Sequence, residues 1–251
     1  MRVLAWRLVL LAAGLVAWEL ASDRLLPAFY ISRPSAIAGR LMQAFASGAI
    51  VPHLATTLVE MVVGFSIGLP LGIAVGLLLG TFRFAARVFQ PFIILLYSIP
   101  LLALAPLFIL WFGVGWAPKI VLVAILVFFF VFFNTYVGAR ELDQDLVASL
   151  RVMGADWGEV FRKVTLPASV VWIFTGVKIA APYALAGAVV GEMLVSRSGL
   201  GLLLMQATQM NDMAALYAVL LVIMVLGILA SEAVERSERL VLRRQGRTAG
   251  G

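Results

Sequence analysis

The chain has 251 residues, of which 63% are hydrophobic and 13% are charged, whereas about a quarter of the residues in soluble domains are charged. The net charge of +6 fits a membrane protein whose basic residues report topology, and nucleic-acid binding is not expected. Without cysteine there are no disulfides or thiolate metal sites, and the single histidine, His53, cannot form a metal cluster alone. We therefore expect an all-α membrane protein without a metal centre.

Six stretches are apolar and long enough for a transmembrane helix, which needs about 20 residues. They are Val3–Ala21, Leu54–Leu79, Val88–Phe112, Ile120–Val137, Ala168–Val195 and Ala214–Val234. Arg7 and Glu19 interrupt the first stretch, for which a cleaved signal peptide is the alternative interpretation. Because five more spans follow, we expect the first span to be retained.

Basic residues predict the orientation of these spans. If both termini are cytosolic, the inner segments hold thirteen Lys and Arg residues and the outer segments five, with Lys178 inside a span. Lys and Arg accumulate in cytoplasmic segments, so both termini and residues 138–167 are expected in the cytosol. The whole chain, 1–251, is then one membrane domain with outer segments at 22–53 and 196–212. Within the first of these, Pro34–Phe45 is predicted to form a short surface helix that opens at Ser32 and Pro34.

The second span carries glycine at every fourth position. The five residues of this glycine stripe are Gly64, Gly68, Gly72, Gly76 and Gly80. Residues four apart share one face of a helix, and small side chains there let another helix backbone approach closely. The stripe predicts a packing face. The spacing fits a neighbour within the chain and a second copy equally.

The third span contains three prolines, Pro91, Pro100 and Pro106, each of which removes a backbone donor and clashes with the preceding turn. The span is expected to be kinked or locally open. Broken membrane helices are tolerated where they line a cavity, so Tyr97, Ser98 and Pro100 are candidates for the wall of a pathway. A bent packing helix is the alternative.

Ionisable residues within the spans are expected to be paired or to face a polar interior. Glu60 and Glu192 lie toward the outer ends of their spans, where we expect solvent to be close. Lys178 lies deeper, and its stem is long enough to reach toward the inner surface. Structural pairing is favoured over substrate contact for all three. The candidate pathway residues are Tyr97, Ser98, Pro100, Asn134, Lys178, Tyr183 and Glu192.

No GxxxxGK[ST], GxSxG or HExxH motif occurs, so the chain is not expected to be an enzyme or to hydrolyse ATP by itself. The most informative segment is instead a polar island at residues 138–167. Leu142, Leu146, Leu150 and Met153 give it the apolar spacing of an amphipathic helix. Gly154 permits a turn, and a second short helix over 156–164 is predicted to end at Leu166 and Pro167.

This island resembles the cytosolic coupling loop of binding-protein-dependent ABC importer permeases. In that motif the sequence EAA is followed by three residues, Gly, nine residues, an aliphatic residue, any residue and Leu-Pro. Gly154, Val164, Leu166 and Pro167 match the second half in type and spacing, whereas residues 148–150 read Ala-Ser-Leu in place of EAA. Because Ala148 stands where the motif has glutamate, any polar contact that this glutamate makes in the family is in doubt. The presence of the loop is not in doubt.

The resemblance extends over residues 30–240. Residues 32–35 (SRPS), 107–115 (LFILWFGVG) and 198–201 (SGLG) look like outer and span-exit segments of the nitrate, sulfonate and taurine permease family. Residues 176–181 (GVKIAA) and 187–192 (GAVVGE) look more like its branch that imports thiamine-precursor pyrimidines and riboflavin. A permease for sulfonate, taurine or nitrate is the alternative within the family. An ion-coupled secondary carrier is the alternative of another class.

The resemblance implies a type I ABC importer permease fold in a bacterial inner membrane. It also implies a homodimer, two copies of a separate ATPase that binds ATP and Mg, and an extracytoplasmic solute-binding protein. This chain itself would bind no cofactor. The residues that would contact the ATPase are Arg151, Met153, Gly154, Ala155, Asp156, Trp157, Leu166 and Pro167.

Overall fold

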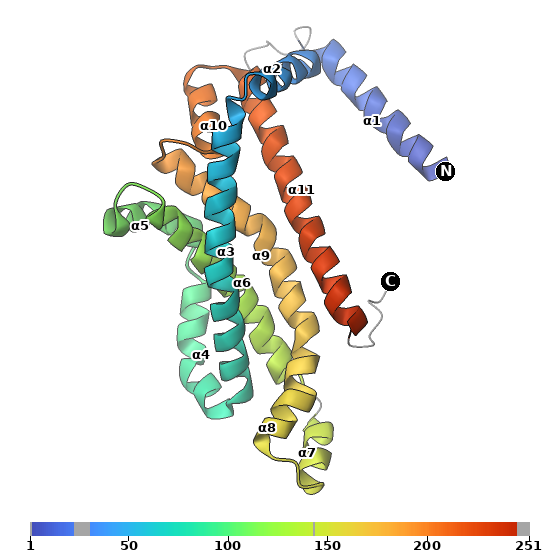
Figure 1. Cartoon of the computed structure of the whole chain (residues 1–251), viewed down its shortest axis with the longest axis vertical. Coiled ribbons are helices and arrows are strands. Elements are labelled where there is room, and N and C mark those ends of the chain that lie inside the picture. Colours follow the sequence, from blue (N-terminus) through green and yellow to red (C-terminus); the bar gives the residue numbers. More distant parts are fainter. Residues whose placement is uncertain (1, 23–30, 143, 245–251) are drawn as a thin grey trace.

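The computed structural model describes residues 2–22, 31–142 and 144–244, and every element within these ranges is a helix (Figure 1). The α-helices are α1 (Arg2–Ala21), α2 (Pro34–Ala46), α3 (Ile50–Thr81), α4 (Arg83–Tyr97), α5 (Ala105–Phe112), α6 (Ala117–Arg140), α7 (Gln144–Val152), α8 (Trp157–Val160), α9 (Leu166–Leu194), α10 (Leu200–Gln209) and α11 (Met213–Arg244). A 3-10 helix, η1 (Leu101–Leu104), precedes α5, and a π-helix, η2 (Phe161–Thr165), joins α8 to α9. The expected all-α class is confirmed.

Four helical stretches are long and apolar enough to cross a membrane. They are Ile50–Thr81, Ala117–Arg140, Trp157–Leu194 and Met213–Arg243. The bent pair formed by α4 and α5 is a fifth candidate. Helix α1 projects away from the remaining helices in Figure 1 and is not among these candidates. A sixth span and cytosolic termini therefore stay predictions.

The predicted third span is two helices rather than one kinked helix. The segments Phe84–Leu96 and Leu101–Phe112 meet at an angle of 74°. Pro91 lies inside α4, which continues past it, whereas Pro100 is extended with φ −71° and ψ 90° and separates the two halves. A proline disfavours the helical conformation of the residue before it, so the chain breaks at Pro100 and restarts at η1.

The glycine stripe of α3 lies against α6 along its whole length. A Cβ atom placed on Gly64 would lie 2.6 Å from Val123 Cβ, one on Gly72 would lie 2.8 Å from the Phe128 carbonyl oxygen, and one on Gly76 would lie 2.7 Å from Thr135 Cβ. No larger side chain fits these positions without moving the helices apart. The helix that packs against the glycine stripe is therefore in the same chain, a choice that the glycine spacing alone did not decide.

Helix α6 also packs against α9 on another face. Gly176 of α9 lies so close to α6 that an added Cβ would be 2.9 Å from the Phe130 carbonyl oxygen. A buried cluster of small and β-branched residues fills this contact, formed by Val123, Val127, Val131, Val177, Ala180, Ala184 and Ala188. Helices α3, α6 and α9 together form the core of the bundle.

The elements at the outer end differ in part from the sequence-based expectations. The short helix expected over Pro34–Phe45 is present as α2, with Arg33 rather than Ser32 at its N-cap. Ser35 donates to the Glu19 carboxylate from its backbone N–H (3.0 Å) and its Oγ (2.6 Å). The charged Glu19 within α1 therefore has a hydrogen-bonding partner. The segment 196–212 is not a simple turn, because it contains α10.

We expect Gly72→Ala to destabilise the folded protein by about 1–3 kcal/mol, because the added methyl group meets the backbone of α6. The thermal unfolding midpoint in detergent measures this effect. Gly227→Ala is the matched control, since its methyl group would lie 3.7 Å from Leu185 Cδ2, an ordinary contact. Equal midpoints for the two variants would contradict the close approach of α3 and α6.

Candidate functional site

The coupling loop (residues 138–167) turns sharply at Gly154, where α7 ends. Gly154 has φ +86°, its N–H donates to the Arg151 carbonyl at 3.0 Å, and the Ala155 N–H donates to the Leu150 carbonyl at 3.0 Å. This pair of hydrogen bonds is a Schellman motif, which satisfies carbonyl groups at a helix C-terminus. A glycine adopts the required left-handed backbone without strain, so the predicted turn has a physical cause.

The next helix begins at once with a capping box. Asp156 is the N-cap of α8, and its Oδ1 accepts from the Glu159 N–H at 2.7 Å, while the Asp156 N–H donates to Glu159 Oε2 at 3.3 Å. The Glu159 carboxylate also accepts from Lys163 Nζ at 2.8 Å. Asp156, predicted to contact the ATPase, therefore has a structural role in starting α8.

The sequence predicted that the second helix of the loop ends at Leu166 and Pro167, and this prediction is wrong. The helix runs on into α9, so Trp157–Leu194 forms one continuous helical stretch. Pro167 lies in the first turn of α9, and the Leu166 N–H bonds to the Phe161 carbonyl in the wider π-helical pattern. A π-turn before the proline accommodates the missing backbone donor without ending the helix.

The tip of the loop is exposed and apolar. Val152 is 89% exposed and Met153 is 82% exposed, with Arg151 and Gly154 beside them also at the surface. Trp157 lies behind the tip, stacked between Phe82 (5.5 Å between centroids) and Phe161 (5.4 Å). Among the predicted contact residues, Ala155 and Pro167 are half-buried, whereas Leu166 is 37% exposed and lies on the helix that leads away from the tip.

A cavity of about 610 Å³ lies where the chain breaks between α4 and α5 and faces α6 and α9. Three of the predicted pathway residues line it: Pro100, Asn134 and Tyr183. Phe129, Phe130, Phe133 and Val137 of α6, Ile179 of α9, Leu126 and residues 99, 101 and 102 complete the lining. The Tyr183 ring lies 4.4 Å from the Phe130 ring, centroid to centroid.

The remaining pathway candidates lie elsewhere. Ser98 is exposed, and its Oγ donates to the Ile94 carbonyl at 2.9 Å. Lys178 is paired, as expected, because its Nζ forms an ion pair with Glu238 of α11 at 2.5 Å. Glu192 has no exposed surface and is not among the residues that line the cavity beside Pro100. Tyr97 is the last residue of α4, and its side chain lies outside the described part of the structure.

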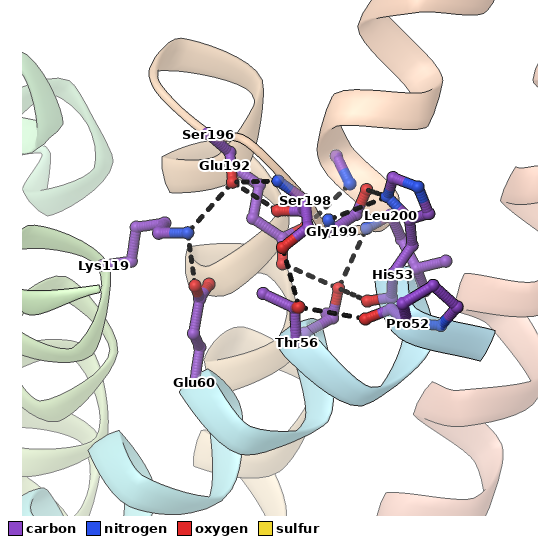
Figure 2. A network of polar contacts seen from close by, with 12 residues as sticks. Pro52, His53, Thr56, Glu60, Lys119, Glu192, Ser196, Ser198, Gly199 and Leu200 are labelled. Carbon is purple, nitrogen blue, oxygen red and sulfur yellow. Dashed lines mark hydrogen bonds and ion pairs between the residues drawn. The ribbon is translucent and has the colours of Figure 1, made fainter. Parts of the chain in front are cut away.

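A network of buried polar groups joins α3, α6 and α9 at the end of the bundle opposite α7 (Figure 2). Lys119 of α6 forms an ion pair with Glu60 of α3, and its Nζ donates to Ser196 Oγ at 3.0 Å. Both Glu60 and Glu192 are 0% exposed. The expectation that solvent lies close to these two carboxylates is therefore wrong, because the lysine and the segment after α9 enclose them.

The same network fixes the segment that follows α9. The Glu192 carboxylate accepts from Thr57 Oγ1 and from the Gly201 N–H, both at 2.7 Å. The Leu200 N–H donates to Thr57 Oγ1 at 3.0 Å, and the Gly199 N–H donates to His53 Nδ1 at 3.0 Å. Gly199 has φ +129°, and an added Cβ would overlap the Glu192 carboxylate. The SGLG sequence therefore wraps closely around one buried carboxylate.

The sequence did not predict Lys119 as a network residue. The predicted fourth span begins at Ile120 and leaves Lys119 in the segment before it. Pro118 in the first turn of α6 was the available signal, because proline is favoured at a helix start and would have placed Lys119 inside the helix. Only 3% of its side chain is exposed.

Replacing Lys119 with Met is expected to leave the Glu60 charge buried and unpaired, at a cost of about 3–5 kcal/mol in unfolding free energy. The double variant Lys119→Met/Glu60→Met should recover much of this loss, because apolar side chains can replace a buried ion pair with little change. Thermal unfolding of both variants in detergent checks the expectation. A double variant as unstable as the single one would contradict the pairing.

Comparisons with known proteins agree with this geometry. Residues 68–243 match the family described as binding-protein-dependent transport system inner membrane component. The riboflavin transport system permease protein RibX of Chloroflexus aurantiacus is 34% identical over 217 residues, covering 86% of this chain and 81% of the relative. The putative aliphatic sulfonates transport permease protein SsuC of Escherichia coli is 36% identical over 250 residues, covering 97% and 92%.

The fold has a solved counterpart in the MetNI methionine ABC transporter in an inward-facing conformation. The TM-score is 0.60 at 23% identity, over 80% of this chain and 97% of that chain. The relatives are permease components and not enzymes, and the family membership removes the secondary-carrier alternative. The family implies partner ATPase and substrate-binding subunits. This multi-pass inner-membrane chain belongs to the binding-protein-dependent ABC importer permeases and serves the import of a small solute.

Proposed function

We propose that this permease imports a neutral aromatic heterocycle, a pyrimidine thiamine precursor or riboflavin. The observation that carries the proposal is the composition of the cavity beside Pro100. Its described walls hold four aromatic rings, those of Phe129, Phe130, Phe133 and Tyr183, and no charged side chain among the described residues. Stacking and edge contacts with such rings favour a planar aromatic solute.

The lining also disfavours the alternative, an importer of aliphatic sulfonates. A sulfonate that entered this cavity would lose water without meeting a guanidinium or ammonium group, and an unpaired buried charge is costly. Asn134 offers a polar handle instead. Its Nδ2 donates to the Phe130 carbonyl at 2.8 Å, which leaves its Oδ1 as an acceptor toward a heterocyclic N–H. The relative named for sulfonates is as similar as the one named for riboflavin, so the argument rests on the cavity.

The proposed assembly has two copies of this chain with six spans each, two ATPase subunits and one solute-binding protein. Both termini and the coupling loop would lie in the cytosol, where the ATPase docks on Arg151, Met153, Gly154 and their neighbours. What supports this is the apolar tip of the loop, since exposed Val152 and Met153 at the end of a membrane bundle fit a protein partner. ATP and Mg would be bound by the ATPase, not by this chain.

Gly154→Asp is expected to abolish copurification of the ATPase while the permease still reaches the membrane. The aspartate places a charge in the docking surface and strains a residue with φ +86°. Gly48→Asp is the matched control, because Gly48 also has positive φ (+71°) and open space around it but lies between α2 and α3. Wild-type ATPase recovery with Gly154→Asp would contradict the docking assignment.

Uptake by the reconstituted transporter tests the substrate. We expect transport of riboflavin or a pyrimidine precursor, and Tyr183→Leu should reduce it severalfold, because an aromatic contact contributes about 0.5–1.5 kcal/mol beyond its buried area. Tyr217→Leu, which removes a ring from α11 outside the cavity, should transport normally. Uptake of taurine without uptake of either heterocycle would overturn the proposal in favour of the sulfonate alternative.

A further inference from the structure

A second cavity, of about 990 Å³, lies behind the coupling loop. Gly80 and Thr81 at the end of α3, and Ala139 and Arg140 at the end of α6, form one wall. Residues of α7 and α8 form the other wall, so the cavity lies between α7 and the ends of the spans. The cavity beside Pro100 shares no lining residue with this one, whereas Arg151, beside the tip of the loop, belongs to its lining.

Three guanidinium groups from three different helices line this cavity. Arg87 comes from α4, Arg140 from α6 and Arg151 from α7. Arg140 Nη1 donates to Tyr136 Oη at 2.7 Å, which leaves most of its N–H donors available. No ion pair joins any of the three to another described residue.

Acidic side chains do not balance these charges within the described lining. Two acids of the loop have partners outside the cavity, since Asp156 caps α8 and Glu159 pairs with Lys163. Basic residues are expected on the inner side of any membrane protein. Their convergence on one cavity from three different helices is not explained by that rule.

The cavity also lies beside the ends of two candidate membrane spans. The candidate spans α3 and α6 end at Thr81 and Arg140, and both residues line it. Trp157 lines it as well, stacked on Phe82, and aromatic rings of this kind gather at membrane–water interfaces. An anionic group at headgroup depth, or one dissolved in the adjoining water, can therefore reach the arginines.

We propose that this cavity binds a phosphate group, held by Arg87, Arg140 and Arg151. The planar donor fork of arginine matches phosphate oxygens in paired, charge-assisted hydrogen bonds. The phosphate comes from the headgroup of an anionic phospholipid or from a soluble phosphate. A phosphate bound by the three arginines links α7 to α4 and α6. It does not cover Val152 and Met153, which do not line the cavity. The site does not depend on which solute is imported, and Arg87 and Arg140 are not among the predicted docking residues.

The test uses the full transporter complex with its ATPase, in wild-type form and as the double variant Arg87→Gln/Arg140→Gln. Native mass spectrometry of delipidated complex titrated with phosphatidylglycerol measures the lipid arm. Equilibrium dialysis with radiolabelled inorganic phosphate measures the soluble arm. Arg236→Gln/Arg243→Gln is the charge-matched control, because these arginines lie on α11 and do not line the cavity.

We expect at least one of the two ligands to bind about tenfold more weakly to the cavity variant than to the control, as expected for loss of a charge-assisted hydrogen bond. Loss confined to phosphatidylglycerol identifies a lipid headgroup, and loss confined to inorganic phosphate identifies a soluble ligand. Equal affinities of both ligands for the two double variants would overturn the proposal. Circular dichroism and ATPase recovery verify that both variants are folded and assembled.

Discussion

The backbone contact between α3 and α6 is the constraint on which the other features depend. Five glycines at every fourth position remove the side chains that would hold the two helices apart, and α6 fills the space with Val123, Val131 and Thr135. Membrane helices gain little from the hydrophobic effect, so such close van der Waals contact is a main source of their association. Since α9 packs on another face of α6, the contact positions three spans at once.

The two ends of this core carry different chemistry. At one end, the register of α3 and α6 brings Glu60 to Lys119, and α9 adds Glu192, around which the SGLG segment is fixed by hydrogen bonds. At the other end, the last glycine of the stripe lies beside Ala139, and the coupling loop and the arginine-lined cavity begin there. The aromatic cavity lies between them, where the break at Pro100 opens the wall beside α6.

Features set by local chemistry were predictable from the sequence. The all-helical class, the glycine face and the turn at Gly154 follow from composition, four-residue spacing and the backbone freedom of glycine. Features set by contacts between distant segments were not. Pro91 and Pro100 carry the same local signal, although only Pro100 separates two helices, and the burial of Glu60 depends on Lys119, which is 59 positions away in the sequence. The π-turn before Pro167, which lets α8 run into α9, likewise has no simple sequence pattern.

The most direct test of the account is a disulfide across the contact of α3 and α6 in this naturally cysteine-free chain. In Gly76→Cys/Thr135→Cys the two Cβ positions are 2.7 Å apart, so a slight separation of the helices reaches the usual bridge geometry of about 3.8 Å. Oxidation of the folded variant should consume both thiols, whereas Gly227→Cys/Thr135→Cys should keep them. Two free thiols in a folded, oxidised Gly76→Cys/Thr135→Cys protein would contradict the packing on which the account rests.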